Sequence, residues 1–209
     1  MIGIILSHIR HIPEGKQGIK EDQYIQRFNV YDQLGFELQE KTFGLVGFGR
    51  IAQRLCAILS GFGAQVLAYD PFVTAEQMKA LNAQPCELMD LLARADVVSV
   101  HARSKECLIG AKEFAQMKDD ALFVNTARGG LVDYEALYDT LSAGRLSGAV
   151  LDVIGTQPFA FYKKMLEMPR VTITPHMAGT TRETVQRGID MVGEDIRRFI
   201  EGEPLLHIM

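Results

Sequence analysis

The chain has 209 residues, of which 47% are hydrophobic and 23% charged, and its 22 basic and 26 acidic side chains give a formal net charge of −4. This composition is typical of a globular domain, and a mildly acidic chain without clustered Lys and Arg is not expected to bind nucleic acid. No apolar run approaches the ~20 residues that span a bilayer, so we expect no membrane partner. Three cysteines without C-x-x-C spacing indicate a reduced, cytoplasmic setting and no metal site.

The first 42 residues differ from the rest of the chain. Ile2 to Ile12 form an apolar, helix-like segment that ends at Pro13, and residues 14–38 are polar with scattered Tyr, Phe and Val. No run in this stretch resembles a strand that could start a sheet. We therefore predict an N-terminal helical arm over residues 1–42.

From residue 43 onward, short apolar runs alternate with Gly or polar turns and helix-period segments. Short strands that are apolar throughout are typical of a parallel sheet buried on both faces. The segments between the runs are long enough for helical crossovers, so we predict an α/β fold, a Rossmann-type doubly wound parallel sheet, over residues 43–204. The predicted strands are Phe43–Phe48, Gln65–Tyr69, Val97–His101, Ala121–Asn125, Gly148–Val153 and Val171–Thr174.

Two helices are indicated by apolar periodicity and end signals. One carries Tyr134, Leu137 and Leu141 on one face and stops at Gly144. The other begins with Thr180 and Glu183 in a predicted capping box and ends near Gly202. Its apolar stripe consists of Val185, Ile189, Val192, Ile196 and Phe199.

A glycine-rich turn follows the first predicted strand. In Gly47-x-Gly49-x-x-Ala52, the first glycine permits a tight turn, the second lets the backbone approach a pyrophosphate, and the alanine lets the helix pack closely. The helix start then offers N–H groups to phosphates. Such a motif alone is weak evidence, and Asp70-Pro71 alone would be a polar turn. Because Asp70 closes the next strand, where it can accept ribose hydroxyls, the combination predicts NAD as cofactor.

Four further segments follow in a set order, and together with the glycine turn they identify a family. The sequence resembles the D-isomer-specific 2-hydroxyacid dehydrogenases, the family of phosphoglycerate dehydrogenase, over roughly residues 39 to 204. The four segments are Ala95–His101, Phe123–Asp133, Leu151–Val153 and Thr172–Gly179.

The resemblance implies a catalytic pair. Arg128 matches the arginine that binds the substrate carboxylate and polarises its carbonyl, a task that suits a guanidinium fork. His176 matches the histidine that gives or takes the hydroxyl proton while a hydride moves to or from nicotinamide. Each could alone be an ordinary surface residue or a structural histidine, so the interpretation depends on the ordered set.

The resemblance also implies cofactor contacts along the chain. Arg50 and Ile51 fall at the pyrophosphate, and Asp152 is the expected partner of the carboxamide, although it could instead be a cap. His101 either lies near the cofactor or is only a polar residue at a strand end. The positions that match the nicotinamide end are Thr126, Ala127, Asp152, Ala178 and Gly179.

One departure from the family lies beside the expected catalytic histidine. The family has Glu before Pro to pair with the catalytic histidine, whereas this sequence has Gln157-Pro158. A neutral amide can orient an imidazole but does not stabilise its charged form, so we expect Gln157 to orient His176 with weaker support for proton donation. Gln at this place also resembles the NAD-dependent formate dehydrogenases, which is a minor alternative.

The chain ends suggest that a domain of the family is missing. We interpret residues 1–42 as a remnant of the interdomain connection and residues 205–209 as a truncated return to an absent substrate domain. The resemblance then implies an NAD-dependent dehydrogenase of small 2-hydroxy and 2-keto acids that forms a homodimer through its cofactor domain. The alternative is a catalytically silent module for NAD binding or dimerisation.

Overall fold

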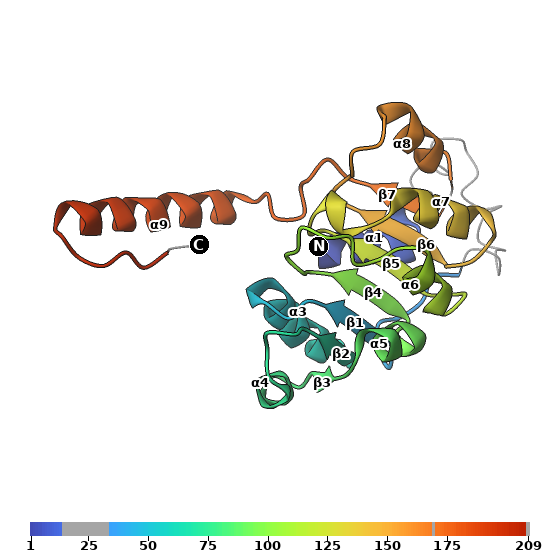
Figure 1. The fold of residues 1–209 in the computed structure, drawn as a ribbon, viewed down its shortest axis with the longest axis horizontal. Helices are drawn as coiled ribbons and strands as arrows, with labels where there is room; N and C mark the ends of the chain where they lie inside the picture. Colours follow the sequence, from blue (N-terminus) through green and yellow to red (C-terminus); the bar gives the residue numbers. More distant parts are fainter. Residues whose placement is uncertain (14–33, 169, 208–209) are drawn as a thin grey trace. The chain divides into compact units, whose positions relative to one another are not determined.

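The computed structural model describes residues 1–13, 34–168 and 170–207 (Figure 1). It divides into two compact units, residues 1–175 and residues 176–209, and each is described by itself. The polar segment predicted over residues 14–38 lies mostly outside the described residues. The domain boundaries at residues 42, 43, 204 and 205 remain predictions.

The first unit is built on one parallel sheet. The seven strands within the described residues follow the order β3-β2-β1-β4-β5-β6-β7, so the chain winds outward from β1 in one direction and then from β4 in the other. All six strand pairs are parallel, as β1 is with both β2 and β4. The strands are β1 (Thr42–Val46), β2 (Gln65–Tyr69), β3 (Gln84–Pro85), β4 (Val97–Val100), β5 (Leu122–Asn125), β6 (Gly148–Leu151) and β7 (Val171–Ile173).

Helices connect the strands and cover the sheet. Among the residues that the structure describes, the helices of this unit are α1 (Ile2–Ile9), α3 (Arg50–Gly61), α4 (Ala75–Ala80), α5 (Leu88–Arg94), α6 (Ala111–Gln116), α7 (Tyr134–Ser142) and α8 (Phe159–Leu166), with a 3-10 turn, η3, at Gly129–Leu131. The predicted helix over 134–144 is thus α7, and Gly144, just beyond it, takes a positive φ of 79°. Glycine tolerates this left-handed conformation, which ends the helix.

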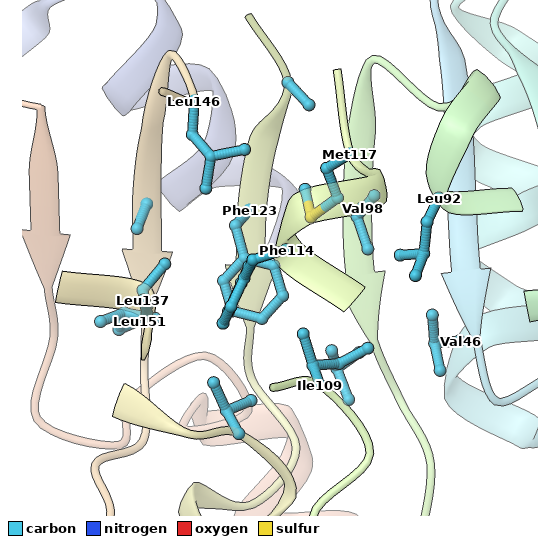
Figure 2. Packing of buried hydrophobic residues seen from close by; sticks show 14 of the residues in the cluster. Val46, Leu92, Val98, Ile109, Phe114, Met117, Phe123, Leu137, Leu146 and Leu151 are labelled. Carbon is cyan, nitrogen blue, oxygen red and sulfur yellow. The ribbon is translucent and has the colours of Figure 1, made fainter. Parts of the chain in front are cut away.

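Two buried clusters lie on the two faces of the sheet. Successive residues of each strand point to opposite faces, so Phe43 joins one cluster and Val46 the other. One cluster includes side chains from α1, α3 and α4, and the other includes side chains from α5, α6, α7 and α8. Figure 2 shows part of the second cluster, where Phe114 of α6 meets Phe123 of β5 edge to face, with ring centroids 5.1 Å apart.

The N-terminal helix belongs to this packing. Ile5 and Ile9, one helical turn apart, are buried in the cluster shared with α3. The His8 ring on the same helix is hydrogen-bonded to Thr172 of β7, with 2.8 Å between Nδ1 and Oγ1. The predicted N-terminal arm therefore begins as a helix docked on the sheet.

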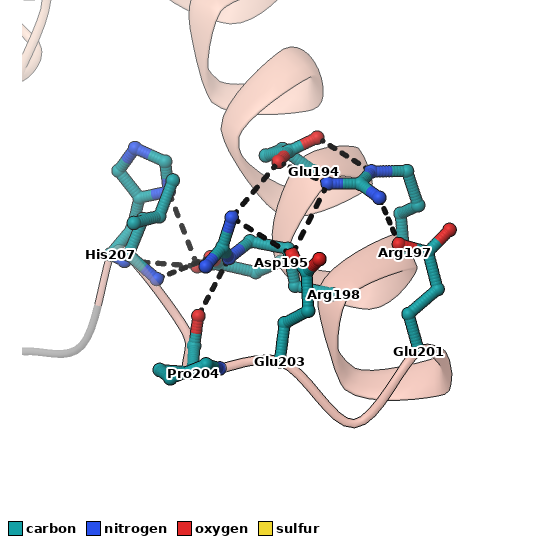
Figure 3. A network of polar contacts seen from close by, with 9 residues as sticks. Glu194, Asp195, Arg197, Arg198, Glu201, Glu203, Pro204 and His207 are labelled. Atoms are coloured by element: carbon teal, nitrogen blue, oxygen red, sulfur yellow. Dashed lines mark hydrogen bonds and ion pairs between the residues drawn. The ribbon is translucent and has the colours of Figure 1, made fainter.

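The second unit consists of a turn, the helix α9 (Arg182–Ile200) and a tail. The N-cap of α9 is Thr181, whose hydroxyl accepts from the Thr184 N–H at 3.1 Å, so the predicted cap at Thr180 is wrong by one residue. The tail folds back along the end of the helix because the Asp195 carboxylate accepts the backbone N–H groups of Leu206 and His207 (Figure 3). None of the α9 residues, the predicted apolar stripe included, is buried.

The predicted fold class is confirmed. All six predicted strands form within two residues of their expected bounds, and the edge strand β3 was not predicted. Its Pro85 lacks a backbone N–H, and two residues carry no apolar pattern. In the part of the chain that the structure describes, no helix is both long enough and apolar enough to cross a membrane.

Candidate functional site

The candidate site begins where the strand order reverses. The chain turns outward on either side of the β1–β4 pair, and ligands of open α/β sheets bind outside the carboxyl ends of the strands at such a point. Gly47 follows β1 with φ of 92°, and a Cβ atom there would lie 2.5 Å from the backbone nitrogen of Ala102, just beyond β4. Only glycine allows the two turns to approach this closely.

The helix after the glycine turn has an open N-terminus. Gly49 is the N-cap of the 12-residue helix α3, no side chain caps it, and the first turn contains no acidic residue. Arg50 is the first residue of the helix, and Ile51 beside it is 71% exposed. Uncapped N–H groups with the positive end of the helix dipole favour an anion.

Asp70 links the second strand to the glycine turn. One oxygen of its carboxylate accepts the Phe48 N–H at 2.7 Å and the other accepts the Phe72 N–H at 2.8 Å. The carboxylate is therefore held at the end of β2 by backbone donors from both sides. A carboxylate oxygen can accept more than one hydrogen bond, so Asp70 keeps the capacity to bind hydroxyl groups.

The end of β4 carries a group of polar side chains. The His101 ring lies 3.0 Å from the Ser99 hydroxyl, measured from Nε2 to Oγ. The same hydroxyl contacts the sulfur of Met1, which also accepts a hydrogen bond from Thr126 at 3.3 Å. Burial lowers the pKa of His101 to about 4, so the ring is neutral at pH 7.

The turn after β5 holds Arg128. The buried Asn125 side chain accepts the Ala127 N–H at 3.0 Å and donates to the Arg128 carbonyl at 3.1 Å, which fixes the turn. The guanidinium donates to the Ala127 carbonyl at 2.7 Å, and the residue is exposed. The cation of Arg128 thus projects from a rigid turn.

The turn after β6 holds Asp152 and Gln157. Asp152 is 1% exposed, and its Oδ1 accepts from the Thr174 hydroxyl at 2.5 Å. The Gln157 carbonyl oxygen accepts from the Tyr162 hydroxyl at 2.8 Å. Because β5 and β6 are neighbours, with Asn125 paired to Leu151, the structure brings Arg128 and Asp152 to adjacent strand ends.

Three predicted site residues belong to the second unit. His176 adopts a positive φ of 55°, and its carbonyl oxygen accepts from the Thr180 hydroxyl. A non-glycine residue in this region of backbone space is uncommon. Ala178 and Gly179 complete the turn, which the Thr180 N–H closes by donating to Met177 at 3.0 Å. Over the residues that the structure describes, no three His, Cys, Asp or Glu side chains form a group that could hold a metal ion.

A scan against family models matches residues 2–178 to the NAD-binding domain of the D-isomer-specific 2-hydroxyacid dehydrogenases. The chain belongs to this family. The match includes the N-terminal helix α1, and so begins well before the predicted start near residue 39.

Relatives and solved structures agree with this family. The chain is 36% identical over 207 residues to a D-3-phosphoglycerate dehydrogenase of Archaeoglobus fulgidus, covering 98% of this chain and 38% of the relative. It is 32% identical to a glyoxylate reductase of Korarchaeum cryptofilum, and the match covers 96% of this chain and 61% of that relative. The crystal structure of a Lactobacillus jensenii D-lactate dehydrogenase with NAD+ superposes with a TM-score of 0.87 at 31% identity, covering all of this chain and 66% of that one.

The chain therefore spans from 38% to 61% of the length of these two curated relatives. The part it matches is the NAD-binding domain, so its cofactor is NAD, as predicted. The residues fit this cofactor: the Gly47 turn has no room for a side chain, no side chain caps the N-terminus of α3, and the Asp70 carboxylate closes β2. Gly47, Gly49 and Arg50 would hold the pyrophosphate, and Asp70 the adenosine ribose.

Sequence reasoning missed three residues that support the site. All three are buried: Asn125 and Tyr134 join the two turns through their polar groups, and the Tyr162 hydroxyl bonds to Gly155 and Gln157 within the second turn. Asn125 was visible as a polar residue closing an apolar strand, which often indicates a structural hydrogen bond. Tyr134 and Tyr162 gave no signal, because a tyrosine on an apolar helix face is indistinguishable from an ordinary core residue.

Proposed function

We propose that the chain is the cofactor-binding part of an NAD-dependent dehydrogenase that interconverts a small 2-hydroxy acid and the corresponding 2-keto acid. The observation that carries this proposal is the placement of Arg128 and Asp152 on adjacent strand ends, at the carboxyl edge that also holds the glycine turn. A cation on a rigid turn beside a cofactor site is suited to a carboxylate substrate.

The bound cofactor supplies a nicotinamide carbon that gives or accepts a hydride. In this proposal Arg128 binds the substrate carboxylate with its guanidinium fork and polarises the adjacent carbonyl. Asp152, with Thr126, Ala127, Ala178 and Gly179, orients the nicotinamide end. His176 gives or takes the proton of the substrate hydroxyl, and Gln157 orients its ring.

A second candidate function is a silent NAD-binding module that assembles as a dimer. The observation that favours it is Gln157, which stands where the family has a carboxylate and whose carbonyl oxygen already accepts from Tyr162. A neutral amide does not stabilise an imidazolium, so proton donation would have weaker support.

Turnover and cofactor binding separate these functions. NADH binding is measured by fluorescence, and NADH oxidation is followed with pyruvate and glyoxylate. We expect binding and turnover, and we expect Arg128→Lys to keep binding but lose most turnover, because an ammonium lacks the bidentate geometry. Binding without turnover would support the silent module. Failure to bind NADH would contradict both, and NAD+ reduction by formate alone would favour the formate dehydrogenase alternative.

We also propose a cytoplasmic homodimer formed through the cofactor domain. The setting is supported by the three free cysteines, Cys56, Cys86 and Cys107. The dimer is supported by family membership alone, and sedimentation equilibrium of the purified chain tests it.

A further inference from the structure

The turns after β5 and β6 are in direct contact. Gly129 begins η3 in the first turn, and a Cβ atom at this position would overlap the carbonyl oxygen of Ile154 in the second. The backbones therefore approach too closely for a side chain between them. Any relative movement of the two turns would open or compress this contact.

Asn125 ties the first turn to a buried tyrosine. Its Oδ1 accepts the Ala127 N–H, and its Nδ2 donates both to the Arg128 carbonyl and, at 3.1 Å, to the hydroxyl of Tyr134. Both residues have no exposed surface. The amide thus uses its oxygen and both of its N–H donors within the core.

Tyr134 carries the connection across to the second turn. Its hydroxyl donates to the Val153 carbonyl at 2.7 Å while it accepts from Asn125. Burial raises the pKa of this hydroxyl, so it keeps its proton and remains a donor. One phenol therefore bridges the carbonyl of Val153 and the side chain that holds the Arg128 turn.

Tyr162 holds the second turn from the other side. Its hydroxyl accepts the Gly155 N–H at 2.7 Å and donates to the Gln157 carbonyl oxygen at 2.8 Å. The direction is fixed because a backbone N–H can only donate, which leaves the phenol proton for Gln157. Gln157 is left with its NH2 group, a donor, for any other partner. The rings of Tyr162 and Tyr134 pack edge to face, with centroids 5.7 Å apart.

We propose that Tyr134 and Tyr162 clamp the Val153–Gln157 turn onto the Asn125–Gly129 turn and so act as positioning residues for Arg128 and Gln157. The clamp itself is a property of the first unit. The roles of the two positioned side chains rest on the proposed function.

Two amide protons of the full chain report on the clamp. Hydrogen exchange at Ala127 and Gly155 is compared with exchange at His101, whose N–H donates to Val46 in another part of the sheet. We expect Tyr134→Phe to speed exchange at Ala127 about tenfold relative to His101, and Tyr162→Phe to do the same at Gly155, because each loses a hydrogen bond of the clamp.

Tyr138→Phe is the matched control. Tyr138 lies on the same helix α7, packs against Phe161, and its hydroxyl has no hydrogen-bond partner among the described residues. This variant should leave both amides unchanged. Equal exchange in Tyr134→Phe, Tyr162→Phe and Tyr138→Phe would overturn the clamp. If Tyr134→Phe does not fold, hydrogen exchange at Gly155 in Tyr162→Phe still tests whether the clamp holds the second turn.

Turnover separates positioning from general damage. We expect Tyr134→Phe to lower kcat/KM for a 2-keto acid about 10- to 100-fold, since a small displacement of a catalytic group is costly. Its dissociation constant for NADH should equal that of the control variant Tyr138→Phe. A parallel loss of NADH binding, or unchanged kcat/KM, would overturn the positioning role. If the wild-type chain has no turnover, the proposed function fails, and the exchange pattern still decides the clamp.

Discussion

The protonation of a single side chain at the site, His101, affects the stability of the fold. Its ring is partly buried at the end of β4, beside the fully buried Ser99 hydroxyl, so protonation would place a charge in a poorly solvated position. Burial therefore lowers the pKa of His101 to about 4, from an ordinary value of 6.5. The unfolded chain takes up this proton at a higher pH than the folded chain. Acid thus favours unfolding between these two values.

The free energy of unfolding should fall as the pH is lowered from 6.5 to 4. At 1.4 kcal/mol for each pKa unit, the His101 contribution lost by pH 4 is about 3 kcal/mol. The His101→Gln variant should not show this part of the pH-dependent loss of unfolding free energy. Urea unfolding of both proteins at several pH values measures it, and the difference between them removes the shared effect of carboxylates. Parallel pH curves would contradict the assignment.

The sequence indicated which residues lie at the candidate site, whereas the residues that hold their turns in place could not be predicted. Arg128 and Asp152 stand in ordered motifs, and the structure brings them to adjacent strand ends. Tyr134 and Tyr162 are far apart in sequence and meet only through the packing of α7 and α8. Local patterns contain no information about such a pairing, because the hydrogen-bond partners are set by the fold.

At the level of elements, continuous burial made the sheet predictable. Strands buried on both faces are apolar runs, and β4 and β5 are buried at every position. The start of α9 was less predictable, because Thr180 and Thr181 both offer a hydroxyl. The structure uses Thr181 as the cap, while the Thr180 hydroxyl donates to the His176 carbonyl. The choice depends on the preceding turn, which a capping pattern does not describe.

The contact of η3 with the turn after β6 should not tolerate a side chain. Gly129→Ala should lower the free energy of unfolding by about 1–3 kcal/mol, because its methyl group would displace the Ile154 carbonyl. A methyl group at the neighbouring Gly130 would meet no atom within 4 Å, so Gly130→Ala should change stability by less than about 1 kcal/mol. Thermal unfolding of the two variants measures the difference. Equal melting temperatures would contradict the close approach of the two turns.

At the scale of the whole molecule, the two units differ in how they bury apolar surface. Both core clusters, with the side chains packed against them, consist of residues up to Ile173 in the part of the chain that the structure describes. In contrast, α9 buries none of its residues, and its cap, ion pairs and tail contacts are all polar. Since apolar burial is the dominant source of stability, we expect the first unit to fold without the second.

A chain of residues 1–175 should therefore fold alone. Because the glycine turn, Asp70, Thr126 and Asp152 all lie in the first unit, this shortened chain should keep cooperative unfolding and most of its affinity for NADH. It lacks His176, Ala178 and Gly179, so any 2-keto acid turnover of the full chain should disappear. Circular dichroism, NADH fluorescence and the turnover assay measure the three properties. A non-cooperative melt would show that residues 176–209 contribute to the folding of the first unit, and retained turnover would remove His176 from the proposed catalytic pair.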